Sequence, residues 1–244
     1  MVTRTHIEWT DTTWNPVTGC SKVSQGCKHC YAERMARRLQ AMGSPRYRNG
    51  FQVTLHADLL NQPLHWIKPR RVFVNSMSDV VHPDVPDTFI ADIFAVMAQT
   101  PQHTYQILTK RPERLARLAG CLPFPPHVWI GTSVESREVM SRIRWLREVP
   151  AAVRFLSCEP LLGPLPQLPL EGIHWVIVGG ESGPHARPMH PEWVLDIRDQ
   201  CVVRDIPFFF KQWGGVQRTR AGRLLEGRLW NEFPECGARS MTSV

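Results

Sequence analysis

The chain has 244 residues, of which 43% are hydrophobic and 21% charged, as is usual for a globular protein with a hydrophobic core. No window of about 18 uninterrupted apolar residues occurs, which excludes a hydrophobic transmembrane helix, and the first residues have no secretory pattern. We therefore expect a cytoplasmic protein with no membrane partner. The net charge of +7 favours anionic partners such as nucleic acid.

A repeated pattern runs along the chain, in which a short apolar segment ends in polar residues and a helical segment follows. Helices are expected at 32–42, 89–97, 113–118, 137–146 and 191–203, and a loop rich in Pro and Leu replaces the helix after residue 160. The eight candidate strands are 7–10, 51–56, 71–75, 105–108, 128–131, 153–156, 175–178 and 207–210.

This alternation predicts parallel βαβ units. The fold class is therefore α/β, as a full or nearly full parallel (β/α) barrel of the TIM type, with an open doubly wound sheet as the alternative. Residues 1–215 are expected to form this single domain, and residues 216–244 a short C-terminal appendage.

A loop at residues 18–32 contains three cysteines, Cys20, Cys27 and Cys30, just before the first predicted helix. Thiolates bind zinc, copper(I) and iron–sulfur clusters. Three thiolates are one fewer than a closed zinc site or a four-iron cluster usually has, so one iron could bind a substrate or cofactor. We expect a [4Fe-4S] cluster, while a zinc site completed by His29 or a distant residue, and unligated thiols, remain alternatives.

The loop and the helix after it resemble the cluster loop of radical S-adenosylmethionine (SAM) enzymes, although the first gap is three residues longer than the common C-x3-C-x2-C spacing. Residues 8–20 and 27–32 more closely resemble the three-Cys-motif, or phage Gp-type, proteins. The resemblance implies that the cluster passes an electron into SAM, which gives methionine and a 5'-deoxyadenosyl radical. That radical would abstract hydrogen from an unknown substrate, with nucleic acid or a nucleotide favoured. A reductase or flavodoxin-type protein would supply the electron.

Polar residues follow the carboxyl end of one candidate strand after another along the chain. In both parallel architectures ligands bind at the carboxyl ends of the strands. Nine such residues on one rim are unlikely all to be structural, so we expect a ligand site there. The set comprises Asp79, Lys110, Arg111, Glu135, Cys158, Glu159, Glu181, Lys211 and Gln212.

Three residues at successive strand ends, Ser76, Lys110 and Ser133, are similar in spacing to a Ser, Lys, Ser set that holds SAM in spore photoproduct lyases. The resemblance implies that Lys110 binds the SAM carboxylate and that the two serines bind its other polar groups. In that DNA-repair family a cysteine hydrogen donor precedes the first serine, whereas this chain has Asn75, which argues against photolesion repair.

The run Gly179-Gly180-Glu181 resembles the Gly-Gly-Glu element that contacts the SAM amino group in many radical SAM enzymes. That element belongs to an early strand of the family, and here it follows the seventh candidate strand. We therefore take these three residues, together with Glu135, as cofactor-binding candidates of undetermined role.

Cys158 and Glu159 are the candidate catalytic residues. Cys158 could be a hydrogen-atom donor, a metal ligand or a packed thiol, because free cysteine also behaves as a small hydrophobic residue. Trp14 and Trp213 are expected in loops near the mouth of the barrel, where they could stack on a base.

Two other functions remain open. A nucleic-acid-binding module would use the basic surface around Arg34, Arg37 and Arg38, with the metal or cluster only shaping it. A hydrolase would keep a structural zinc on the cysteines and would activate water with a divalent metal. Its metal ligands would be Asp79, Glu135, Glu159 and Glu181.

Overall fold

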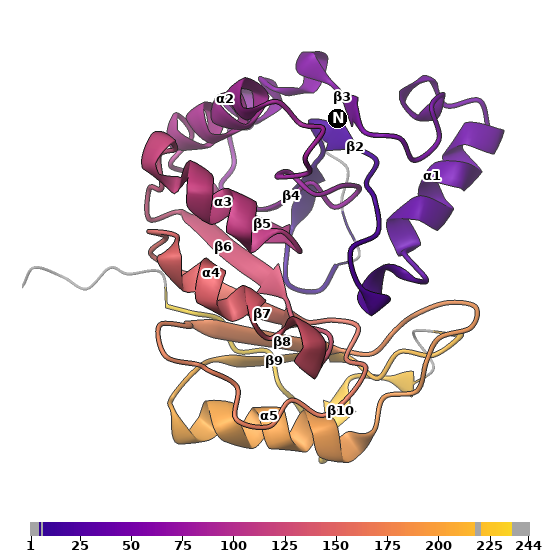
Figure 1. The fold of residues 1–244 in the computed structure, drawn as a ribbon, viewed down its shortest axis with the longest axis vertical. Helices are drawn as coiled ribbons and strands as arrows, with labels where there is room; N and C mark the ends of the chain where they lie inside the picture. The colour runs from indigo at the N-terminus through magenta and orange to yellow at the C-terminus, as the bar shows by residue number, and fades with distance from the viewer. Residues whose placement is uncertain (1–4, 6, 218–220, 236–244) are drawn as a thin grey trace, which may run out of the picture.

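The computed structural model describes residues 5, 7–217 and 221–235. Seven parallel strands form one curved sheet in the order β1-β4-β5-β6-β7-β8-β9, and β1 and β9 are its two edges (Figure 1). The predicted α/β class with a parallel barrel-like sheet is confirmed as a half-barrel. The strands are β1 (Thr12–Trp14), β4 (Arg71–Val74), β5 (Thr104–Thr109), β6 (Val128–Ser133), β7 (Arg154–Cys158), β8 (Trp175–Gly179) and β9 (Phe208–Gln212).

The predicted strand at 51–56 is wrong as a member of this sheet. Only β3 (Thr54–Leu55) forms there, and it pairs antiparallel with β2 (Val17–Thr18) in a separate two-stranded sheet. Neither residue of β3 is buried, so the alternation of residue types in this segment does not reflect a sheet face. The first strand begins at residue 12, because residues 7–10 form a turn that places Trp9 against the sheet.

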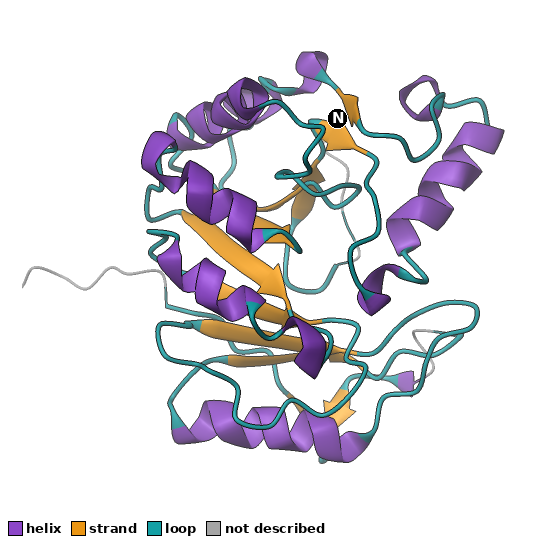
Figure 2. Cartoon of the chain, in the orientation of Figure 1, coloured by secondary structure: helices purple, strands orange, loops and turns teal. Residues whose placement is uncertain are grey.

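Helices α2 (Asp87–Ala98), α3 (Pro112–Leu118), α4 (Arg142–Glu148) and α5 (Pro191–Val203) cover the outer side of the sheet, and α1 (Tyr31–Ala41) stands apart beside its open end (Figure 2). The predicted helices are present, although 137–146 is divided into a 3₁₀ turn, η6 (Arg137–Val139), and α4. As predicted, no helix lies between β7 and β8. None of the helices in the described residues is long and apolar enough to cross a membrane.

Alternate residues of the strands serve two different hydrophobic clusters. Val72 and Val74 belong to the cluster shared with the helices, while Phe73 between them belongs to a cluster on the concave side. The same alternation separates Phe208 and Phe210 from Phe209. Because side chains along a strand point to opposite faces, the strand members of the concave cluster show which alternate positions point inward. Its buried members are Trp9, Phe73, Trp129, Val153, Phe155, Trp175, Ile177 and Phe209.

The described residues after β9 pack against that strand. β10 (Leu224–Leu225) and β11 (Arg228–Leu229) form an antiparallel hairpin, and Phe210 N donates to Trp230 O at 2.9 Å. Trp175 Nε1 donates to Glu232 O at 2.8 Å, so this segment also covers the concave cluster at the amino-terminal ends of the strands.

Gly131 is an inward residue of β6, and its missing side chain leaves room for the Phe155 ring of the neighbouring strand. A Cβ at this position would lie 2.4 Å from the Phe155 ring. We predict that Gly131→Ala lowers the free energy of unfolding by about 1–3 kcal/mol through overpacking, as measured by urea denaturation.

Gly120→Ala is the control for Gly131→Ala, because a Cβ there has no neighbour within 4 Å, and it should leave stability within about 0.5 kcal/mol of wild type. Equal stabilities for the two variants would show that the packing of the Phe155 ring does not require glycine at position 131.

Candidate functional site

Above the aromatic cluster, the inward positions of the same strands change from hydrophobic to polar. On β6 the alternation runs from Trp129 through Gly131 to Ser133, and on β7 it runs from Phe155 to Ser157. These positions lie at the carboxyl ends of the strands, where parallel sheets bind ligands. Most of the predicted site residues are among them: Lys110, Ser133, Glu135, Glu159, Gly179 and Glu181.

The cysteine loop lies across these strand ends. In Figure 1 it is the dark segment that joins β2 to α1, beside the carboxyl ends of the central strands. Its start is fixed by backbone contacts, since Gly19 N donates to Met77 O at 3.0 Å and Cys20 N donates to Phe51 O at 3.1 Å. Three carboxylates, one from each of three alternate strand ends, fix the rest of the loop.

The first of these carboxylates is Asp79, just after β4. It binds Arg111 at 3.0 Å and accepts from Thr109 Oγ1 at 2.8 Å. Arg111 in turn donates to Cys20 Sγ at 3.5 Å and to Ser21 O at 3.0 Å. Burial is the main cause that raises the pKa of the Cys20 thiol; Asp79 adds to it, and the Arg111 cation opposes it.

The second is Glu135, which follows β6 and is completely buried. Its Oε2 accepts from Arg142 Nη1 at 2.8 Å, while Oε1 accepts from Ser24 Oγ and from Gly26 N at 3.3 Å. Burial alone would raise the pKa of Glu135, but Lys110, Ser24 and Arg142 together lower it. A Cβ on Gly26 would lie 2.8 Å from this carboxylate, so only glycine allows the contact.

The third is Glu181, which follows β8. It accepts from Arg187 Nε at 2.9 Å and Arg187 Nη2 at 2.5 Å, and it lies 3.0 Å from His29 Nδ1. Arg187 also donates to Gln25 O at 3.1 Å. Burial opposes ionisation, but the hydrogen bonds from Arg187 and His29 outweigh it and lower the pKa of Glu181 to about 2.

The predicted SAM-binding residues lie between these ties. Lys110 Nζ donates to Ser133 Oγ at 3.0 Å, so two of the three residues are brought together. Ser76 Oγ donates to Asn15 Oδ1 at 3.1 Å. Asn75, at the end of β4, is 2% exposed, has φ of 58°, and its buried Nδ2 has no hydrogen-bond partner among the described residues. A donor in this state is suited to a bound polar ligand.

Glu159 faces Lys211 across the ends of β7 and β9. Lys211 Nζ lies 2.8 Å from Glu159 Oε2, and both side chains are mostly buried. A Cβ on Gly179 would lie 2.8 Å from the same oxygen, and one on Gly180 would lie 2.0 Å from Trp213 O. The two glycines therefore give room to the Glu159 carboxylate and to the chain after β9.

The remaining candidates, Cys158, Trp14 and Trp213, are packed in the core or hydrogen-bonded to backbone carbonyls. Cys158 belongs to the helix-side cluster and is fully buried, which favours the packed thiol among its three alternatives. The expected loop position of Trp14 is wrong: it lies in β1, fully buried, with Nε1 donating to Leu59 O at 2.8 Å. Trp213 follows β9 as expected, and its Nε1 donates to Leu224 O at 2.8 Å.

The loop offers three thiols from one backbone segment, which suits a four-iron cluster in which one iron has no protein thiolate. Within residues 5, 7–217 and 221–235, no three His, Cys, Asp or Glu side chains are gathered closely enough to hold a metal ion. In a four-iron cluster each thiolate binds a different iron atom. The cluster on Cys20, Cys27 and Cys30 therefore stays a prediction that rests on the donor chemistry.

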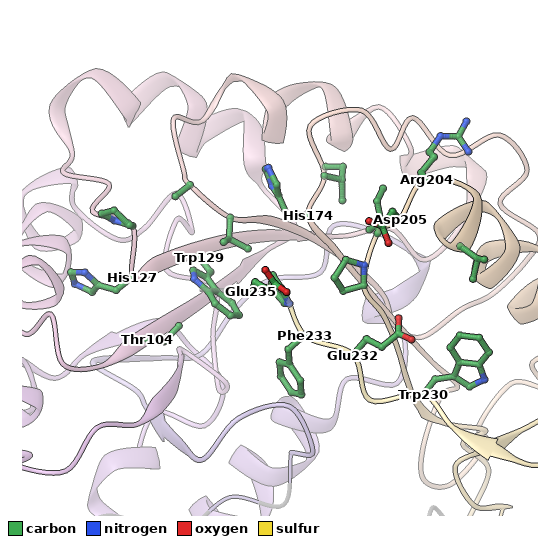
Figure 3. A pocket seen from close by; sticks show the side chains of 18 of the residues that line it. Thr104, His127, Trp129, His174, Arg204, Asp205, Trp230, Glu232, Phe233 and Glu235 are labelled. Carbon is green, nitrogen blue, oxygen red and sulfur yellow. The ribbon is translucent and has the colours of Figure 1, made fainter. Parts of the chain in front are cut away.

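A large pocket of about 1470 Å³ lies at the opposite, amino-terminal ends of the strands (Figure 3). Its lining includes Thr104, Trp129 and His174, from the starts of β5, β6 and β8, and Trp230 and Glu232 from the segment after β11. Acidic and basic side chains are mixed in it, and none of the predicted site residues takes part.

Residues 4–234 match the model of a family described as "Protein of unknown function (DUF5131)". The chain belongs to this family. No curated protein sequence matches this DUF5131 chain. The resemblance to three-Cys-motif phage proteins is not tested by the family match and stays a prediction.

Among solved structures, the DUF5131 chain is similar to spore photoproduct lyase complexed with dinucleoside spore photoproduct, with 14% identity and a TM-score of 0.50. A cysteine-to-serine mutant of that enzyme gives 15% identity and a TM-score of 0.51. Each match covers 74% of this chain and 58% of the lyase. At this identity the likeness shows a shared fold.

We predict that Glu135→Gln destabilises the DUF5131 chain by about 3–5 kcal/mol, because it leaves the buried Arg142 guanidinium without its counter-charge. Urea denaturation would measure the loss, and amide hydrogen exchange at Gly26 should become faster. The control is Glu138→Gln, an exposed carboxylate three residues away, which should change stability by less than about 0.5 kcal/mol. Unchanged exchange at Gly26 would contradict the hydrogen bond between the Gly26 amide and the Glu135 carboxylate.

We also predict a pH dependence carried by Glu181. Its pKa is about 2 in the folded protein and about 4.3 when unfolded, so its stabilising contribution is present above pH 4.3 and is lost as the pH falls toward 2. The difference in unfolding free energy between wild type and Glu181→Gln should therefore shrink over this range in urea titrations. The control Glu192→Gln, at a side chain that is 69% exposed, should show no such trend, and a constant difference for Glu181→Gln would refute the prediction.

Proposed function

We propose that this protein is a radical SAM enzyme that carries a [4Fe-4S] cluster on Cys20, Cys27 and Cys30. The single observation that carries the proposal is the position of the three-cysteine loop, which is tied by Asp79 and Glu135, and by a third carboxylate, across the carboxyl ends of a parallel half-barrel. The shared fold with spore photoproduct lyase supports it.

The residues at the mouth have the chemistry that SAM requires. SAM carries a carboxylate, an ammonium group and ribose hydroxyls, which need a cation, acceptors and hydrogen-bonding partners. Lys110, which is hydrogen-bonded to Ser133, is proposed to bind the carboxylate. Ser76, and the Asn75 Nδ2 that has no hydrogen-bond partner among the described residues, lie at the neighbouring strand end and are proposed to bind the other polar groups. Glu135, Glu181, Gly179 and Gly180 are proposed to shape the pocket and hold the loop.

When bound, the cluster and SAM would supply a one-electron reduction that cleaves SAM and leads to hydrogen abstraction from the substrate. The chain's own residues would orient the two groups and exclude water, since Phe155 and Trp175 in the aromatic layer below the mouth are completely buried. Glu159, bound to Lys211, is the candidate catalytic residue that faces this space.

The proposed substrate class is nucleic acid or a nucleotide, in line with the net charge and with the dinucleoside spore photoproduct bound in the lyase structure of similar fold. Asn75 occupies the position that precedes Ser76, where the resemblance would place a cysteine hydrogen donor. We therefore propose a reaction other than photolesion repair. A reductase or flavodoxin-type protein is the proposed electron donor, and the cytoplasm the proposed compartment.

The carboxylates that a hydrolase would need are each committed to other groups. Asp79, Glu135 and Glu181 each bind a different arginine, and Glu159 binds Lys211. No observation therefore favours the hydrolytic alternative, and we do not propose it.

The test is anaerobic reconstitution with iron and sulfide, followed by EPR of the reduced protein with and without SAM. We predict a four-iron signal that shifts when SAM is added, because SAM would bind the iron without a protein thiolate. The signal should be lost in Cys27→Ala and retained in Cys121→Ala, which removes an exposed thiol outside the loop. Stoichiometric zinc without iron uptake in wild type would refute the proposal.

A further inference from the structure

The positive charge of the chain is concentrated in one segment. Residues 20–48 contain seven cationic side chains and one acidic one, so this segment carries +6 of the net charge of +7. The rest of the chain is almost neutral. The segment consists of the cysteine loop, α1 and the turn η2 (Pro45–Tyr47), which are contiguous in space as well as in sequence (Figure 1). Its cations are Lys22, Lys28, Arg34, Arg37, Arg38, Arg46 and Arg48.

Three of the seven cations have a carboxylate partner, and one of these, Arg46, pairs with Asp58 at 2.8 Å. Glu33 alone serves two of them, since it lies 3.3 Å from Lys22 Nζ and 2.7 Å from Arg37 Nη2. Within the described part of the chain, the side chains of Lys28, Arg38 and Arg48 form no ion pair or hydrogen bond, and all three are exposed. An excess of exposed, unpaired cations on one surface attracts a polyanion.

The exposed arginines of α3 and α4 are arranged differently. Arg117 pairs with Glu113 at 2.8 Å, and Arg147 pairs with Glu171 at 2.7 Å. Each of these cations has its own carboxylate, as expected for an ordinary solvated helix surface. By contrast with these two helices, residues 20–48 have several exposed cations without a carboxylate partner, gathered in one segment.

The shape of this basic surface suits an extended ligand. α1 buries only Ala32 and Ala36 against the body of the protein, so most of its length of about 16 Å is exposed. A surface pocket of about 660 Å³ lies between α1 and the cysteine loop, and Cys20, Lys22 and Arg37 are among the residues that line it. A strand that follows the basic surface would thus run toward the loop.

We propose that residues 20–48 form a docking surface for a nucleic acid strand. Five of the seven cations are arginines, whose planar guanidinium groups bind phosphate with two hydrogen bonds. Cations spread along a helix match the regular charges of a phosphodiester backbone. The inference rests on the proposed function in one respect: the docked strand is presented to the site at the cysteine loop as substrate.

The test is fluorescence anisotropy with a labelled, mixed-sequence single-stranded oligonucleotide over a range of salt concentrations. The triple variant Arg37→Ala, Arg38→Ala and Arg48→Ala should bind about tenfold more weakly or worse. Its plot of log affinity against log salt should be flatter by about 2, at roughly 0.7 per lost phosphate contact.

The matched control also removes three exposed arginines: Arg117→Ala, Arg144→Ala and Arg147→Ala. It should bind the oligonucleotide within about twofold of wild type. An equal loss in both triple variants would show that only the net charge matters, and it would overturn the docking surface. Absence of binding by wild type would do the same. Labelled polyglutamate bound as tightly as the oligonucleotide would replace the nucleic acid with an acidic protein partner.

Two further measurements separate this inference from the proposed function. Cys27→Ala should keep oligonucleotide binding, because the arginines do not require the cluster. The arginine triple variant should keep the wild-type EPR signal and urea stability. If wild type takes up no iron and yet loses binding on removal of the three arginines, the docking surface stands while the radical SAM proposal fails.

Discussion

The position of the cysteine loop depends on three buried or nearly buried carboxylates, and the rest of the site depends on that position. Asp79, Glu135 and Glu181 are spaced on alternate strand ends, and each binds an arginine. Glu135 and Glu181 also contact the loop directly, whereas Asp79 acts on it through Arg111. A buried carboxylate is costly unless it is paired and hydrogen-bonded, so each of these residues constrains both partners. Together they hold a polar loop over an aromatic core.

Much of the fold follows from the period of two in the strands. If Phe155 points inward, the alternation along β7 places Ser157 and Glu159 on the inward side and Cys158 on the helix side. The sequence alone could therefore have predicted that the Cys158 thiol faces the helices. The strand predicted at 51–56 failed because its alternation was not matched by burial. The half-barrel could not be told from a full one, because closure depends on pairing between edge strands that are far apart in the chain.

The strand-end carboxylates were predicted as site residues, but not their partners. Arg142 comes seven residues after Glu135, and Arg187 six after Glu181, and no spacing rule predicts that these arginines turn back to the strand ends. His29 was considered as a metal ligand, whereas its ring binds Glu181. These contacts depend on how the loops return over the mouth, which local propensity does not determine.

The ties to the loop also set the order in which the protein can mature. Gln25 and His29 reach their partners Arg187 and Glu181 only after about three quarters of the chain has been synthesised. Until then the loop lacks one of its three anchors. The loop therefore gains its full set of anchors only after β8 has been synthesised, although its cysteines lie within the first 30 residues.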